Sequence, residues 1–89
     1  MGRRTQSREI AARYGLNLRR ERQRVGLTQA RVADRAGVRR PAVSLLEAGR
    51  QAPTVELTFR LGGALGVHPA VLLNGMSWDP ETDEFIIAD

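Results

Sequence analysis

The chain has 89 residues, which suits a single domain with a modest hydrophobic core. It contains no cysteine, and this excludes a disulfide framework and a zinc site built from thiolates. No apolar run approaches the length of a membrane span, and the arginine-rich start lacks the apolar stretch of a signal peptide. The composition therefore predicts a soluble cytoplasmic protein without a membrane partner.

The charge is distributed unevenly along the chain. The net charge is +4, but residues 1–50 carry thirteen arginines against four acidic residues, a local charge of +9. Residues 51–75 are neutral overall, and residues 76–89 carry five acidic residues and no base, a local charge of −5. A basic segment followed by an acidic tail favours a polyanionic partner for the first half of the chain. The alternative is a solvated basic face with no partner.

The first predicted helix covers residues 8–25 and follows a polar, basic arm, residues 1–7, that we expect to be flexible. Ser7 is placed to cap the first turn, and Gly26 is placed to end the helix. The apolar residues of this helix recur every four positions, at Ile10, Tyr14 and Leu18.

Two short helices are predicted next, on either side of one glycine. Thr28 is a suitable cap for a helix over residues 29–36, and Gly37 suits the left-handed turn that reverses the chain. The following helix begins near Pro41, because a proline in the first turn removes no helical hydrogen bond, and it ends at Gly49.

A fourth helix is predicted from the cap at Thr54 to about Leu65. Two glycines, Gly62 and Gly63, lie inside it, and each costs about 1 kcal/mol relative to alanine. Their presence indicates close packing against another helix, or a kink. A short fifth helix, residues 69–73, follows.

These five helices cover one another's apolar faces without any strand, so the predicted fold is an all-α, compact five-helix domain over residues 8–75. An acidic tail, residues 76–89, follows, with a short β-like run at residues 85–87. This tail is either loosely packed, or docks on a basic protein partner, or folds back as a strand across a homodimer.

Two charged residues occupy positions on apolar helix faces. The stripe that begins at Ile10 reaches Arg22, and the residue four positions after Val43 is Glu47. Since an unpaired buried charge is very costly, we expect Arg22 and Glu47 to form an ion pair that ties the first helix to the third. The alternative is that both side chains reach solvent at the edge of the stripe.

Two arginines, Arg39 and Arg40, stand at the start of the third helix, where the helix dipole disfavours cations. Their position is sensible if an anion lies outside this helix end, since backbone N–H groups and guanidinium groups then converge on it. The same reasoning applies to Thr28 and Gln29 at the start of the second helix.

Two helices joined by a glycine turn, with cations at the start of the second, describe a helix-turn-helix. Residues 14–73 resemble the Cro and phage-repressor (xenobiotic-response-element) helix-turn-helix family, which has the lambda-repressor-like fold. The matching residues are Arg22, GLTQ at 26–29, Ala33, AGV at 36–38, Val43-Ser44, Leu46-Glu47, Gly49, Pro53 and LGV at 65–67.

The resemblance implies that the third helix lies in the major groove of double-stranded DNA. It implies base-facing or groove-facing positions for Arg40, Pro41, Ser44 and Leu45, and phosphate-facing positions for Thr28, Gln29, Arg39 and Arg50. Arg22 and Glu47 match the family's internal ion pair. An arginine at position 40 suits the O6 and N7 atoms of guanine, whereas Leu45 suits a thymine methyl group. Pro41 stands where relatives often carry a polar reader, and it disfavours helical geometry at Arg40.

The predicted function is sequence-specific DNA binding by a transcriptional regulator, a repressor or autoregulator. Such a protein is expected to be associated with the nucleoid and to bind a palindromic operator as a homodimer. The two copies are expected to contact each other through the fifth helix, the loop before it or the tail. The alternative is an antitoxin or bridging coactivator whose acidic tail binds a protein. An enzyme is not expected, because the single histidine, His68, has no catalytic partner in view. No cofactor or metal site is predicted.

Overall fold

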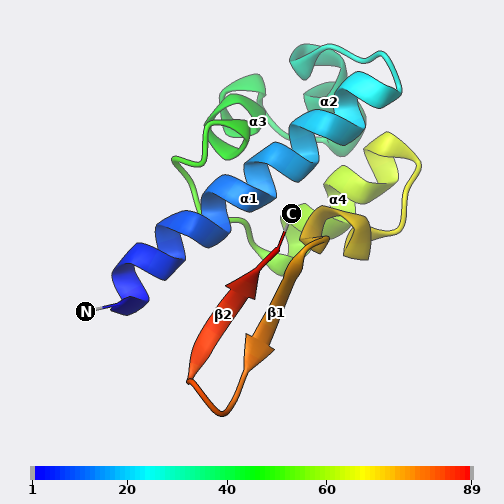
Figure 1. Cartoon of the computed structure of the whole chain (residues 1–89). Helices are drawn as coiled ribbons and strands as arrows, with labels where there is room; N and C mark the ends of the chain where they lie inside the picture. The colour runs from blue at the N-terminus through cyan, green and yellow to red at the C-terminus, as the bar shows by residue number, and fades with distance from the viewer. Residues whose placement is uncertain (1, 89) are drawn as a thin grey trace.

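The computed structural model describes residues 2–88 of the chain (Figure 1). Its elements, in chain order, are α1 (Gly2–Arg24), α2 (Gln29–Ala36), α3 (Arg40–Glu47), α4 (Val55–Leu65), the 3-10 helix η1 (Pro69–Leu73), β1 (Met76–Asp79) and β2 (Glu84–Ile87). Four α-helices surround one core, and a β-hairpin lies beside α1, as Figure 1 shows.

The helix boundaries around α2 and α4 agree with the predictions. The hydroxyl of Thr28 accepts a hydrogen bond from the Arg31 N–H at 3.1 Å, and that of Thr54 accepts one from the Leu57 N–H at 3.1 Å. Gly37 and Gly66 follow the two helices in the left-handed conformation, with φ of 69° and 73°. Each helix therefore begins and ends where its capping residues allow.

Helix α1 starts earlier than predicted. It begins at Gly2, so the segment that we expected to be a flexible arm is helical from that residue onward, and Ser7 lies inside the helix instead of capping it. The helix ends at Arg24, and Gly26 follows with a φ of 73°. A long-range contact accompanies the earlier start, because the side chain of Gln6 hydrogen-bonds Phe85 of the hairpin and so holds this turn of α1 against the protein.

The helical lambda-repressor-like fold agrees with the prediction, but the five-helix count and the form of the tail are corrected. The fifth helix has the predicted bounds, Pro69–Leu73, but it is a 3-10 helix. The acidic tail forms an antiparallel hairpin, in which Trp78 faces Phe85 with their rings 5.0 Å apart, edge to face. In the turn between the strands, Asp83 has a φ of 58°. The Asp79 carboxylate stabilises the start of this turn by accepting a hydrogen bond from the Glu81 N–H at 2.9 Å.

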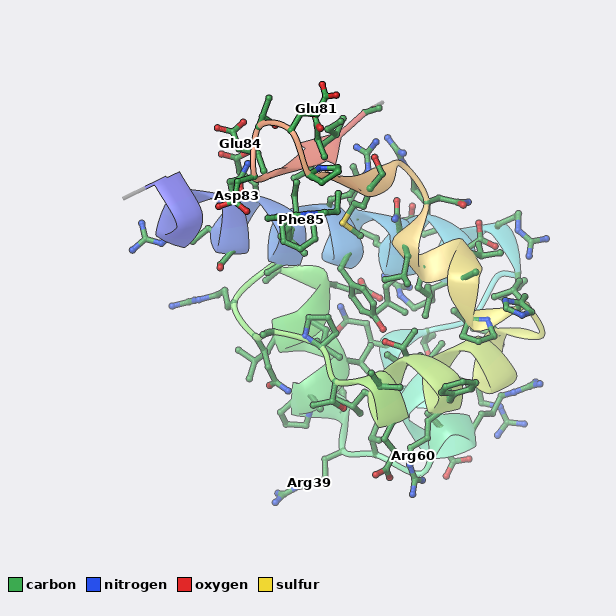
Figure 2. All side chains as sticks on the ribbon, turned by 90° about the horizontal axis from the view of Figure 1, so that it is seen from below. Arg39, Arg60, Glu81, Asp83, Glu84 and Phe85 are labelled. Atoms are coloured by element: carbon green, nitrogen blue, oxygen red, sulfur yellow. The ribbon has the colours of Figure 1, made fainter. Side chains whose placement is uncertain are left out.

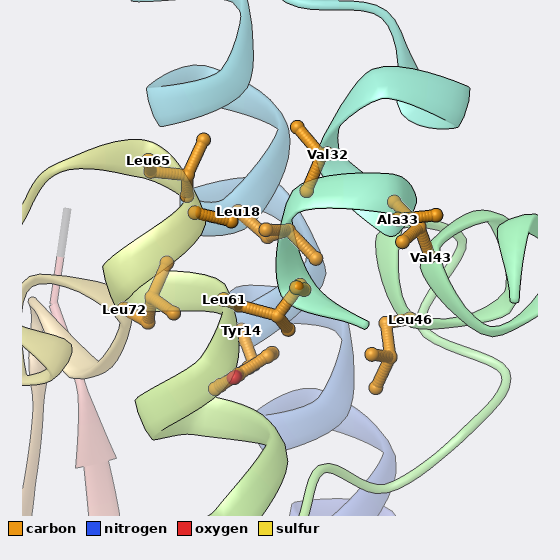
Figure 3. Close-up of a cluster of buried hydrophobic side chains, with 11 residues drawn as sticks. Tyr14, Leu18, Val32, Ala33, Val43, Leu46, Leu61, Leu65 and Leu72 are labelled. Carbon is orange, nitrogen blue, oxygen red and sulfur yellow. The ribbon is translucent and has the colours of Figure 1, made fainter. Parts of the chain in front are cut away.

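The core lies between the four α-helices and η1, and Figure 3 shows its side chains converging from all of these elements. Its fully buried large residues are Tyr14, Leu18, Val32, Val43, Leu46, Leu61 and Leu72. The Tyr14 hydroxyl is satisfied by Thr58 of α4 at 2.9 Å, and burial raises the pKa of Tyr14 above its ordinary value. Asn17, also buried, donates to the carbonyls of Leu72 and Asn74 at 3.0 and 2.9 Å. Both polar groups therefore tie α1 to the C-terminal half of the domain.

Helix α1 approaches the end of α3 through two glycines. A Cβ atom on Gly15 would overlap the backbone carbonyl of Leu46 and would lie 2.7 Å from the carbonyl oxygen of Glu47. A Cβ atom on Gly49 would lie 2.9 Å from the Cα of Ala12, and Gly49 also has a φ of 70°. This contact, which fixes the position of α3 on α1, has no room for side chains.

The two glycines inside α4 differ in their surroundings. A Cβ atom on Gly62 would lie 3.0 Å from the Val67 carbonyl oxygen and 3.1 Å from the Cα of Pro69, whereas one on Gly63 would meet nothing within 4 Å. Close packing therefore explains Gly62, as predicted, but it is against the loop and η1 and not against another α-helix. Nothing in the structure explains Gly63.

Candidate nucleic-acid interface

Arg22 and Glu47 form a two-point ion pair between α1 and α3. The Arg22 Nε lies 2.6 Å from Glu47 Oε2, and Nη2 lies 3.0 Å from Oε1. Nη1 donates to the Leu27 carbonyl at 2.9 Å, so the same guanidinium also holds the turn before α2. The side chains are only 14% and 5% exposed, and the hydrogen bonds to Glu47 outweigh burial and raise the pKa of Arg22. The two residues do not reach for solvent.

Gln29 at the start of α2 joins this ion pair. Its Nε2 donates to Glu47 Oε1 at 3.1 Å, so the Glu47 carboxylate receives hydrogen bonds from α1 and from α2. The resemblance implied that Gln29 faces a phosphate, but its side-chain amide is engaged inside the protein. We call Arg22, Gln29 and Glu47 the clasp. The clasp joins α1 and α2 to the end of α3, and so helps to fix the position of α3.

The start of α3 is exposed and carries two cations. Arg39 is the N-cap, in an extended conformation and without a side-chain cap. Because Pro41 has no N–H group, Arg40 supplies the N–H group that the first turn leaves open. Arg40 is the first helical residue of α3, which corrects the expectation that Pro41 would displace it from helical geometry. The preference is mild and is outweighed here, since the Ala42 N–H donates to the Arg39 carbonyl at 3.0 Å and closes the first turn.

The outward face of α3 carries the remaining predicted reading residues. Pro41, Ser44 and Leu45 are exposed, whereas Val43 and Leu46 point into the core. Arg50, just after the helix, is exposed as well. All the positions implied as base-facing therefore lie on one accessible side of a short helix, as a helix that enters a groove requires.

The exposed arginines divide into paired and unpaired groups. Arg24 pairs with Glu21 at 2.9 Å, Arg31 with Asp34 at 3.5 Å, and Arg60 with Glu56 at 2.8 Å. Within the part of the chain that the structure describes, none of the cations near α3 has a carboxylate partner; these are Arg19, Arg39, Arg40 and Arg50. Among the described residues, four exposed arginines without a carboxylate partner therefore lie around α3, although others, such as Arg20 on α1 and Arg35 on α2, lie elsewhere on the surface.

The acidic side chains of the hairpin lie on a different side of the molecule. Figure 2 shows Glu81, Asp83 and Glu84 at one end of the view and Arg39 at the opposite end. All three acidic residues are exposed. The molecule is thus polar in charge, and the hairpin does not cover the start of α3.

Sequence reasoning missed a polar depression next to α3. It has a volume of about 240 Å³ and is lined by Arg19, Arg22, Gln29, Ser44, Glu47 and Ala48. Arg19 stands three residues before Arg22, on the same side of α1, and this spacing was the available signal.

An apolar groove between α4 and η1 was missed too. It has a volume of about 380 Å³ and is lined by Pro53, Thr54, Val55, Thr58, Phe59, His68, Pro69, Ala70 and Leu73. Val55 is 75% exposed and Phe59 63%, although both are large apolar residues of a helix. His68 uses its Nδ1 to accept a hydrogen bond from the Ala70 N–H at 3.0 Å, so it caps η1.

The described residues contain neither a membrane-spanning helix nor a cluster of metal ligands. Among residues 2–88, no helix is both long and apolar enough to cross a lipid bilayer. In the same part of the chain, no three His, Cys, Asp or Glu side chains come together in a way that would hold a metal ion.

Comparison with known proteins finds helix-turn-helix proteins both by sequence and by structure. Residues 18–72 match the family HTH_3, described as helix-turn-helix. An uncharacterised HTH-type transcriptional regulator of Methanothermobacter thermautotrophicus is 43% identical over 49 residues, which are 55% of this chain and 71% of the relative.

Two solved structures share the fold. The restriction-modification controller protein C.AhdI of Aeromonas hydrophila has a TM-score of 0.68 and 29% identity, over 70% of this chain and 94% of that one. The P22 c2 repressor in complex with a synthetic operator has a TM-score of 0.64 and 31% identity, over the same shares of 70% and 94%. The family match covers more than half of the chain and includes α2, α3 and α4, which confirms the resemblance drawn from the motifs. The chain belongs to the HTH_3 helix-turn-helix family.

Proposed function

We propose that this protein is a DNA-binding transcriptional regulator that places α3 in the major groove of double-stranded DNA. The observation that carries the proposal is the unpaired positive charge at the start of a short helix whose outward face, with Ser44 and Leu45, is exposed. The guanidinium groups of Arg39 and Arg40, with the Arg40 N–H, suit phosphate oxygens at this helix end. A similar protein, the P22 c2 repressor, is a repressor solved with its operator, which supports the same role here.

The roles of the side chains follow from their positions. We assign base reading to Arg40, Ser44 and Leu45, with Pro41 filling the groove without a hydrogen bond. A bidentate contact from Arg40 to guanine O6 and N7 discriminates by about 1–3 kcal/mol, and Leu45 selects apolar groups such as a thymine methyl. Arg39 and Arg50 set the register on the phosphates and read no sequence.

The start of α2 also faces phosphate in this proposal. Thr28 caps the helix through its hydroxyl oxygen, and Gln29 Nε2 is engaged by Glu47. The contribution of Gln29 is therefore assigned to its backbone N–H group and to the helix dipole rather than to its side chain.

The experiment that tests the proposed function is the selection of binding sites from random duplex DNA, with wild type and Arg40→Ala. We expect a palindromic site in which the variant loses the guanine preference at one position of each half-site. Arg39→Ala is the matched control, because it should weaken binding to all sequences alike and keep the preference. An absence of binding to any duplex at low salt would disprove the proposal. An unchanged guanine preference in Arg40→Ala would disprove the role of Arg40.

We further propose that the protein acts as a homodimer on this palindrome, as a repressor or autoregulator at the nucleoid in the cytoplasm. The groove between α4 and η1 supports the dimer. Its apolar residues Val55, Phe59 and Leu73 are 75%, 63% and 48% exposed, and together they form a continuous apolar surface with a hollow. Burial of this surface by a second copy also gives a small module the affinity that one half-site does not provide.

A second candidate function, that of an antitoxin or bridging coactivator, is favoured by one feature of the hairpin. The Gln6 side-chain amide bonds both the N–H and the C=O of Phe85, at 3.3 and 3.2 Å, so α1 covers the outer edge of β2. Trp78 is paired with Phe85 in the antiparallel ladder. Because the N–H and C=O of Phe85 point away from β1, those of Trp78 point away from β2, toward the outer edge of β1. An extended basic segment of a partner fits this edge beside Glu81 and Glu84.

The second candidate predicts a separation of activities. A hairpin variant such as Glu81→Lys with Glu84→Lys should keep operator affinity and oligomeric mass, yet lose control of a reporter gene in cells. Unchanged reporter control would exclude a partner that recognises these charges.

A further inference from the structure

The polar depression beside α3 has the structure of an anion site, and the inference drawn from it rests on the proposed function. Its walls come from three helices: Arg19 and Arg22 from α1, Gln29 from α2, and Ser44 and Glu47 from α3. The lining is mostly polar, although the depression lies against a hydrophobic core. Solvent-facing polar groups from three elements therefore meet at one place, next to the face of α3 that we assign to the major groove.

The charges in the depression do not cancel. Arg22 and Glu47 neutralise each other in the clasp, and Gln29 Nε2 is engaged by the same carboxylate. Arg19 is exposed, and within residues 2–88 no carboxylate pairs with it. The depression consequently has one uncompensated positive charge at its rim and the Ser44 hydroxyl, a hydrogen-bond donor, on another wall.

We propose that this depression binds a phosphate group of the DNA backbone, with Arg19 as its principal ligand. A cation that already pairs with a neighbour gains little from an outside anion, whereas Arg19 has no internal partner to give up. The contact extends the interface from α2 and α3 to α1. Because the clasp residues also line this depression, the bound phosphate would lie next to the residues that position α3.

The chain offers a matched control for Arg19. Arg20 is the next residue of α1, equally a surface arginine without a carboxylate partner in the described part of the chain, but it does not line the depression. Successive residues of an α-helix point about 100° apart, so Arg20 is directed elsewhere. Substitution of either arginine by alanine suits a helix surface, and both variants should fold.

The experiment measures duplex DNA affinity as a function of sodium chloride concentration for wild type, Arg19→Ala, Arg19→Lys and Arg20→Ala. Loss of one phosphate contact reduces the slope of log K against log salt by about 0.9. Arg19→Ala should therefore lower the slope by about 0.9 per bound protomer, or about 1.8 for the proposed dimer, for the selected site and for random DNA alike. Arg19→Lys should restore most of the slope, and Arg20→Ala should leave it unchanged.

Each other outcome overturns the inference. An unchanged slope in Arg19→Ala means that no phosphate lies in the depression. An equal fall in Arg20→Ala means that only overall charge matters. A loss confined to the selected sequence gives Arg19 a base-reading role. Failure of the wild-type protein to bind any duplex would overturn the proposed function itself, and this result is distinct from the other three.

Discussion

At the scale of single residues, the clasp explains how a small core accommodates two ions. Two nitrogens of the Arg22 guanidinium donate to the Glu47 carboxylate, and the third donates to the Leu27 carbonyl. Gln29 donates a further hydrogen bond to Glu47. Glu47 is the shared partner, so its removal leaves the Arg22 guanidinium without a counter-ion and Gln29 Nε2 without its acceptor. The group is therefore expected to respond to single substitutions much more strongly than a surface ion pair.

The prediction for Glu47 follows from this arrangement. Glu47→Ala should lower the free energy of unfolding by about 3 kcal/mol, because it leaves the mostly buried guanidinium of Arg22 unpaired. Asp34→Ala is the matched control on the surface, since it breaks a pair in which Arg31 is 61% and Asp34 76% exposed, and it should cost less than about 1 kcal/mol. Urea denaturation of the three proteins measures both values. Equal losses in the two variants would contradict a buried clasp.

Some of these residue roles could be predicted from the sequence and others could not. The Arg22–Glu47 contact followed from two apolar stripes with a four-residue period, because a charge on a buried face requires a partner. The hydrogen bond from Gln29 to Glu47 could not be predicted, since the resemblance directed attention to an external phosphate. Arg19 was missed because its three-residue spacing from Arg22 is a weak signal among fourteen arginines until its neighbours in space are known.

At the scale of elements, capping residues determined which boundaries could be predicted. Thr28 and Thr54 begin α2 and α4, and Gly37 and Gly66 end them, because these signals act within a few residues. The start of α1 and the hairpin depend instead on each other. Gln6 bonds Phe85, which is 79 positions away, and neither segment shows a strong pattern by itself. A local reading of the sequence therefore missed both.

The contact between α1 and α3 gives a prediction at this scale. Gly15→Ala should destabilise the protein by about 1–3 kcal/mol, because the new methyl group would overlap the backbone at the end of α3 and push the reading helix outward. DNA affinity should fall together with stability. Gly63→Ala is the control in a helix interior, and it should stabilise by up to about 1 kcal/mol, since a Cβ atom there meets nothing.

Thermal unfolding and a binding titration on the same samples test this pair. A Gly15→Ala protein as stable as the wild type would show that α3 can move on α1 without cost, which contradicts the close approach seen between the two backbones.

At the scale of the whole molecule, the apolar groove and the hairpin are the two candidate surfaces for the proposed dimer. Phe59→Glu places a charge in the groove between α4 and η1, and we expect it to convert a dimer into a monomer and to weaken operator binding. Ile86→Glu places the same charge at an exposed apolar residue of the hairpin, and it should leave the dimer intact. Sedimentation equilibrium distinguishes the two. Monomers from Ile86→Glu alone would assign the dimer contact to the hairpin.

The hairpin carboxylates and Arg39 lie at opposite ends of the view in Figure 2, and this separation contributes an electric dipole whose positive end points toward the start of α3. In the field of a polyanion such a dipole experiences a torque, so the molecule turns before it touches. Fewer collisions are then wasted on the wrong side of the protein, and the wrong side is actively repelled. The effect fades within roughly a Debye length, about 8 Å at physiological ionic strength, which makes the rate of productive encounter itself a function of salt.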